Sequence, residues 1–108
     1  MKISVQESDG TYRITLAGKD ATPENIEEFK NAFERGIEPS GQSALVLDIT
    51  DLNYLGSEGV GVIASAHKRL HERGRRLIVR NPTQAVARVL MVTRLDNFLE
   101  IERTTGSR

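Results

Sequence analysis

Apolar and polar residues alternate in two stretches near the start of the chain, at residues 2–7 and 12–17. Alternation with a period of two is typical of strands that are buried on one face. Ser8, Asp9 and Gly10 lie between the two stretches, and Asp-Gly favours a tight turn because it tolerates positive φ angles. These residues predict an antiparallel β-hairpin.

The period then changes to that of a helix. Residues 22–24 supply a hydroxyl cap, a proline for the first helical position and an acid for the first turn. Ile26, Phe29 and Phe33 recur at helical spacing and form one apolar stripe. Gly36 is expected to end this helix, because glycine readily adopts the left-handed conformation of a helix C-terminus.

A short apolar run at residues 44–49 is typical of a strand that is buried on both faces. A connection at 51–55 leads to a second helix, predicted over residues 57–73 and ended by Gly74. Residues 76–80 follow as a further buried strand. These elements form the centre of the predicted domain.

The last elements are a turn with a helix cap at residues 81–83, a third helix at 84–93 and a short edge strand at 97–102. The order ββαβαβαβ predicts an α/β fold, a mixed and mostly parallel sheet of about four to five strands with helices packed on it. One domain is expected over residues 1–102, with a frayed tail at 103–108. Its core is expected to bury the following inner residues: Ile26, Phe29, Phe33, Val46, Ile63, Leu77 and Leu90.

Composition excludes several kinds of site. The 108 residues suffice for one hydrophobic core, and the absence of cysteine excludes disulfides, thiolate zinc sites and cysteine nucleophiles. No apolar run approaches the roughly 18 residues that span a bilayer, and no signal peptide is recognisable. A soluble, cytoplasmic protein without a membrane span is expected.

Charge is unevenly distributed although the formal net charge is zero. Residues 1–58 hold 11 acidic and five basic side chains, whereas residues 59–108 hold four acidic and ten basic ones. No aromatic residues interleave with the basic ones for base stacking. The basic excess is therefore interpreted as a solvated face, and no direct nucleic-acid partner is expected.

Ser57 is the main candidate for chemistry, because it lies at the predicted start of the second helix among Gly56, Gly59 and Gly61. Serine is a favoured N-cap residue, so a purely structural interpretation of Ser57 is that it caps this helix, which is compatible with a functional role. The glycine spacing matches neither a phosphate-binding loop nor a dinucleotide fingerprint, so no nucleotide cofactor is expected.

A catalytic serine would need a base nearby. His67 lies ten residues further along the same predicted helix, about 15 Å away at 1.5 Å per residue, whereas a nucleophile and its base are about 3 Å apart. His67 and His71 are at i, i+4, but no acid on that face completes a metal site. We therefore expect no catalytic residue, metal or other cofactor.

Several short segments keep a characteristic order and spacing: 45–48 (LVLD), 56–62 (GSEGVGV), 67–69 (HKR), 73–74 (RG), 77–82 (LIVRNP), 85–90 (AVARVL) and 95–96 (LD). Together they resemble the anti-sigma factor antagonists of the STAS domain family. The resemblance covers nearly the whole chain and is strongest over residues 44–101.

The resemblance implies a binding module and not an enzyme. Such antagonists bind an anti-sigma factor, often a serine kinase, and so free a sigma factor for transcription. Phosphorylation of a serine at the position of Ser57 releases the antagonist, and a serine phosphatase restores it. Partner contacts around this phosphoacceptor are expected at Lys19, Asp20, Asn53, Gly56, Glu58, Gly59 and Val60.

The chain departs from the family pattern beside the acceptor. Gly56 stands where the family usually has aspartate, and Glu58 where it has serine, threonine or alanine. Lys19 also stands where an acid is common. Glycine at position 56 would in addition permit a positive φ angle.

Two alternatives remain open at this point. One is a small STAS subunit of a larger assembly, such as a lipid-transport complex or a stress-signalling scaffold, without a phosphorylation switch. The other is an enzyme that uses Ser57 or Glu58.

Overall fold

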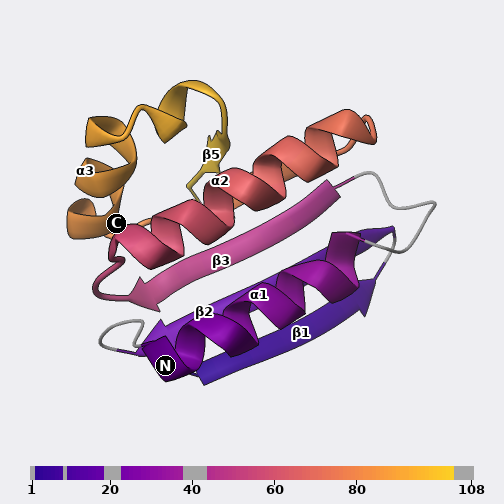
Figure 1. Ribbon diagram of the computed structural model, residues 1–108, viewed down its shortest axis with the longest axis horizontal. Coiled ribbons are helices and arrows are strands. Elements are labelled where there is room, and N and C mark those ends of the chain that lie inside the picture. Colours follow the sequence, from indigo (N-terminus) through magenta and orange to yellow (C-terminus); the bar gives the residue numbers. More distant parts are fainter. Residues whose placement is uncertain (1, 9, 19–22, 38–43, 104–108) are drawn as a thin grey trace.

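The computed structural model describes residues 2–8, 10–18, 23–37 and 44–103 (Figure 1). The described elements, in chain order, are β1 (Lys2–Ser8), β2 (Thr11–Gly18), α1 (Pro23–Ile37), β3 (Ala44–Leu52), α2 (Ser57–Glu72), β4 (Arg76–Arg80), α3 (Gln84–Val92), the 3₁₀ turn η1 (Leu95–Asn97) and β5 (Glu100–Glu102). This order confirms the predicted α/β class. The polar tail at 104–108 and the cap residue Thr22 lie outside the described residues.

The strands form one five-stranded sheet in the order β1-β2-β3-β4-β5. The hairpin β1–β2 is antiparallel, and every later pair is parallel, as the alternation of helices and strands predicted. Figure 1 shows α1 lying over β1 and β2, α2 lying over β3, and α3 beyond α2 on the side away from α1. The sheet and its helices form two layers around a single core.

The core lies between the sheet and the helices. Tyr12, Leu45 and Leu77 share one row across β2, β3 and β4, and all three are buried. Five of the seven expected core residues belong to this cluster: Phe29, Phe33, Ile63, Leu77 and Leu90. Ile26 packs against the cluster and is only partly buried.

Val46 is buried, but the prediction that it shares this core is wrong. Its neighbours Leu45 and Leu47 point to the helices, and successive residues of a strand point to opposite faces. Val46 therefore lies on the far face, in register with Arg13 and Ile78. A strand that is buried on both faces carries no alternation that could have shown this.

Gly36 does not end the first helix, which continues to Ile37. A Cβ atom at Gly36 would lie 2.5 Å from the ring of Tyr12 and 2.8 Å from Leu45 Cδ1. Tyr12 also donates a hydrogen bond from its hydroxyl to the carbonyl of Ala32. The glycine is thus explained by close packing of α1 on the sheet and not by helix termination.

The end of α2 follows the prediction. Gly74 has φ +69°, its N–H donates to the carbonyl of His71, and the next N–H, of Arg75, donates to the carbonyl of Leu70. This pair of bonds is a Schellman motif. The side chain of Arg75 is buried and donates to the carbonyl of Ile37 at 2.8 Å, which joins this turn to the end of α1.

The last strand is at the sheet edge as expected, but it is shorter than residues 97–102. The N–H groups of Phe98 and Leu99 both donate to the carbonyl of Leu95, continuing the η1 turn. These donors are therefore not available to pair with β4. Only Glu100–Glu102 forms the strand.

Candidate functional site

The site is built around the start of α2, beside the carboxyl end of β3. Gly56 is the N-cap residue, with φ −89° and ψ −178°, so its backbone is extended and does not have a positive φ angle. The N–H of Val60 donates to the carbonyl of Gly56 at 3.0 Å, which closes the first helical turn. Ser57 is the first helical residue, in agreement with the helix predicted from residue 57, and Gly56 takes the cap position.

Ser57 and Glu58 are both exposed on this first turn. The Ser57 hydroxyl makes no hydrogen bond with any residue that the structure describes, and Glu58 makes no ion pair with them. An acid here is favoured by the partial positive charge of the helix N-terminus. The turn therefore presents one hydroxyl and one carboxylate to an approaching molecule.

Gly59 and Val60 differ from their neighbours in exposure. Gly59 is buried, and a Cβ atom there would lie 2.4 Å from Leu55 Cδ1. Its small size is therefore needed for packing under the surface. Val60 is half-buried and packs against the core.

Asn53 is exposed, and its N–H donates to the carbonyl of Gly18 at 3.1 Å. Gly18 is the last residue of β2, so the two strand ends are joined beside the start of α2. Lys19 and Asp20, which follow Gly18, lie outside the described residues. Of the expected contact residues, the structure thus brings together Asn53 and the first turn of α2.

Tyr54 is a surface residue that sequence reasoning missed. It is 54% exposed, and its ring lies beside Gly56, where an added Cβ atom would be 3.4 Å from Tyr54 Cε2. Exposed tyrosines are enriched among the residues that dominate protein interfaces. The available signal was a lone aromatic residue in a connection immediately before the helix.

The same edge of the sheet is braced by the start of α3. Thr83 caps α3, accepting a hydrogen bond from the N–H of Val86, and donates its own hydroxyl to the carbonyl of Leu52 at 3.2 Å. Asn81 donates from its side chain to Thr50 Oγ1 at 3.1 Å. These bonds join the end of β3 to the segment between β4 and α3.

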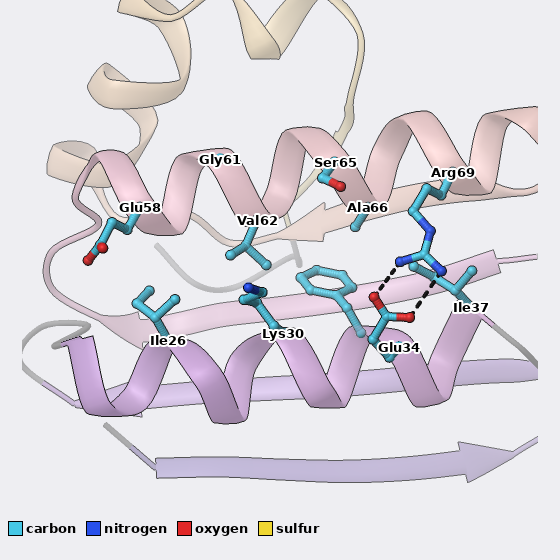
Figure 2. Close-up of a pocket in the computed structure, with 11 residues that line it drawn as sticks. Ile26, Lys30, Glu34, Ile37, Glu58, Gly61, Val62, Ser65, Ala66 and Arg69 are labelled. Atoms are coloured by element: carbon cyan, nitrogen blue, oxygen red, sulfur yellow. Dashed lines mark hydrogen bonds and ion pairs between the residues drawn. The ribbon is translucent and has the colours of Figure 1, made fainter.

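A groove of about 380 Å³ extends from this surface between α1 and α2 (Figure 2). Glu58 lies at one end of it, and the other end is closed by a bidentate ion pair between Arg69 and Glu34. The hydrogen bond from Arg69 lowers the pKa of Glu34 below its usual value, and burial opposes this effect without reversing it. The groove is thus continuous with the exposed turn.

The described residues offer little for catalysis or metal binding. His67 is half-buried and His71 exposed, and their rings lie 5.9 Å apart in the second half of α2. Both share one continuous helix with Ser57, so neither reaches its hydroxyl. Across the described part of the chain, no three His, Cys, Asp or Glu side chains gather to hold a metal ion. Within that same part, no helix has the length and apolar character needed to cross a membrane.

Comparisons with known proteins agree with this geometry. Residues 3–101 match the family described as Mlab, STAS domain. The anti-sigma-B factor antagonist of Listeria monocytogenes is 31% identical over 111 residues, which cover 98% of this chain and 92% of that protein.

Solved structures of two further proteins share the fold. An anti-sigma factor antagonist from Mycobacterium paratuberculosis has a TM-score of 0.84 at 22% identity, covering 96% of this chain and 86% of that one. SpoIIAA has TM-scores of 0.82 in its unphosphorylated form and 0.77 in its phosphorylated form, at 19% identity. These matches cover 97% of this chain and 90% and 93% of the SpoIIAA chains. With its sheet order, its helix start at Ser57 and a family match over nearly its whole length, the chain belongs to the STAS domain family.

Proposed function

We propose that this protein is an anti-sigma factor antagonist that binds an anti-sigma factor through the start of α2. The observation that carries the proposal is the exposed Ser57 hydroxyl on the first turn of α2, without a bonding role among the described residues. The Listeria relative, which bears this function in its name, supports the choice of partner. The contact surface comprises Lys19, Asp20, Asn53, Tyr54, Gly56, Ser57, Glu58, Gly59 and Val60, with Gly59 contributing from beneath.

Ser57 is the proposed phosphoacceptor, with the anti-sigma factor as its serine kinase and a serine phosphatase to reverse the reaction. That SpoIIAA has been solved in a phosphorylated form supports a switch on this fold. The protein itself acts by binding and not as an enzyme.

A phosphate on Ser57 should leave the free protein nearly as stable as before. It adds about −1.5 to −2 charges. The helix N-terminus favours an anion by roughly 0.3–1 kcal/mol, whereas Glu58 repels it through screening solvent. These opposing effects nearly cancel.

The same phosphate in a docked interface would lose its water. Desolvating an uncompensated ion costs several kcal/mol, and about 1.4 kcal/mol corresponds to tenfold in affinity. Binding should therefore weaken by roughly a hundredfold or more. Because Glu58 is already charged, the partner should place a basic group opposite it.

The test compares Ser57→Asp with Ser57→Ala in titrations against the purified anti-sigma factors of the source organism. The aspartate variant should bind at least about tenfold more weakly than the alanine variant, with both variants unfolding at similar temperatures. Equal affinity of the two variants would remove Ser57 from the interface. Intact mass of the protein from its own cells, with the increment mapped to Ser57, tests the modification directly.

A second candidate is a STAS subunit of a larger assembly without a phosphorylation switch. It is favoured by Glu58, which places a permanent negative charge beside the acceptor. Stoichiometric co-purification with such an assembly, with Ser57 unmodified in every growth condition, would support this candidate over the first.

A further inference from the structure

The groove between α1 and α2 has an apolar floor, in which Ile26 and Val62 are the partly exposed side chains. The floor is formed by Ile26, Phe33, Ile37, Val62 and Ala66. Figure 2 shows Ile26, Ile37, Val62 and Ala66 between the two helices, with Lys30 reaching over the middle from α1. Its volume of about 380 Å³ lies in the range of protein pockets that receive a ligand group.

The α2 wall of the groove is low at Gly61, one turn after Ser57. A Cβ atom at Gly61 would meet nothing within 4 Å, and no positive φ angle requires glycine there. Packing explains Gly59, and the N-cap explains Gly56, but neither explains Gly61. A glycine inside a helix weakens it relative to alanine, so its place on this wall favours a close approach by another molecule.

The charges around the groove are selective for a basic group. Lys30 lies 3.7 Å from Glu27, and Arg69 is paired with Glu34. Glu58 is the lining charge for which the described residues offer no ion pair. It also belongs to the proposed contact surface, so a molecule that docks at Ser57 reaches the groove without a gap.

We infer that this groove receives an apolar side chain, of leucine or phenylalanine size, from a helix of the anti-sigma factor. A lysine or arginine of the same helix lies opposite Glu58. Glu58 and Arg69 are eleven residues apart on α2, about 16 Å along its axis, which suits roughly three turns of a docked helix. A helix seated between two others is the usual ridges-into-grooves packing. This inference rests on the proposed function.

The experiment fills the groove from its own wall. Gly61→Leu places a side chain where the docked residue would lie, and Ser65→Leu does so one turn further along the lining. His71→Leu is the matched control, because it adds an apolar side chain to an exposed position of the same helix outside the groove. Each variant is titrated against the anti-sigma factor that binds the wild-type protein, and its thermal unfolding is recorded.

Both groove variants should bind about ten- to a hundredfold more weakly than wild type, and the control should bind within about twofold. Methyl signals of Ile26 and Val62 in NMR spectra of the wild-type protein should shift when the anti-sigma factor is added. If one groove variant unfolds at a clearly lower temperature than wild type, the test relies on the methyl signals and on the other groove variant.

The outcomes separate the two ideas. Wild-type affinity in a folded groove variant, or unshifted methyl signals in a complex that forms, would overturn the groove inference and leave the proposed function standing. If none of the anti-sigma factors binds the wild-type protein, the proposed function fails and the groove inference fails with it.

Discussion

At the scale of single residues, three glycines of this chain have three different reasons to be glycine. Gly36 avoids the ring of Tyr12, Gly74 adopts a left-handed conformation, and Gly61 faces open space. The residue type alone does not show these roles, because each role depends on the backbone conformation of the glycine and on the atoms that a side chain there would contact. Substitutions at these positions and at Gly56 should therefore differ in sign.

Alanine should have opposite effects at Gly36 and Gly61. At Gly36 the new methyl group overlaps the Tyr12 ring and Leu45, so the free energy of unfolding should fall by about 1–3 kcal/mol. At Gly61 the methyl group meets nothing, and the free energy should rise by up to about 1 kcal/mol through helix propensity. Urea unfolding of both variants measures this, and equal effects would mean that α1 does not pack on Tyr12 as described.

Gly56→Asp should stabilise the protein slightly. Residue 56 is an extended N-cap, aspartate caps helices better than glycine by a few tenths of a kcal/mol, and its charge suits the helix N-terminus. The new Cβ atom lies 3.4 Å from Tyr54, which is an ordinary contact. A thermal shift assay should show a small rise in Tm. A clear fall would show that glycine is needed there for its shape.

At the scale of elements, the ion pair between Glu34 and Arg69 joins α1 to α2, and the bond from Arg75 joins the turn after α2 to the end of α1. Burial lowers the pKa of Arg75, with a smaller contribution from the charge of Arg73. These contacts join residues more than 30 positions apart in the sequence. They therefore affect the packing of the helices against each other and not the formation of each helix.

The Glu34–Arg69 pair should make stability depend on pH in the acid range. The pKa of Glu34 is lowered in the folded protein, so its contribution is present above the usual value of 4.5 and is lost as the pH falls through the folded value. The pair is half-exposed, so the contribution should be at most about 1 kcal/mol. Urea unfolding of wild type and Glu34→Gln should converge below about pH 4.

Arg69→Gln is the partner control for this measurement. It should remove the same part of the pH dependence, because the shift of Glu34 comes first from its hydrogen bond with Arg69. A Glu34→Gln variant that keeps the full wild-type pH profile would show that the pair contributes nothing in solution.

At the scale of the whole molecule, one core between the sheet and the helices holds the site in place. Ser57 and Glu58 lie on the surface of α2, which also forms one wall of the groove, and the inner face of α2 packs into that core through Ile63 and Leu70. Loss of core packing should therefore lower the free energy of unfolding. It should weaken partner binding only to the extent that the protein unfolds.

Leu77→Ala should lower the free energy of unfolding by about 2–5 kcal/mol, because Leu77 is 2% exposed and lies in the central row of the core. Ile78→Ala, at the half-buried neighbouring position on the far face of β4, should cost clearly less. Chemical unfolding of both variants measures the difference. A Leu77→Ala effect below about 1 kcal/mol would contradict the position of β4.

The local pattern was sufficient for most elements. Alternation predicted the hairpin, helical spacing predicted α1, and Gly74 and Thr83 marked a helix end and a helix start, because these signals act over a few neighbouring residues. The family resemblance pointed to Ser57 as the site.

Tertiary structure alone decided the features that join distant residues. The face of Val46, the packing role of Gly36, the burial of Arg75 and the groove between α1 and α2 each depend on residues that are far apart in the chain. The choice between Ser57 as the cap and Ser57 as the first helical residue was also left to the structure, because serine occurs at both positions and the backbone of Gly56 decides between them. Sequence periodicity determines which residues face the core, because it depends on neighbouring positions. Only the folded chain determines which distant residues they contact there.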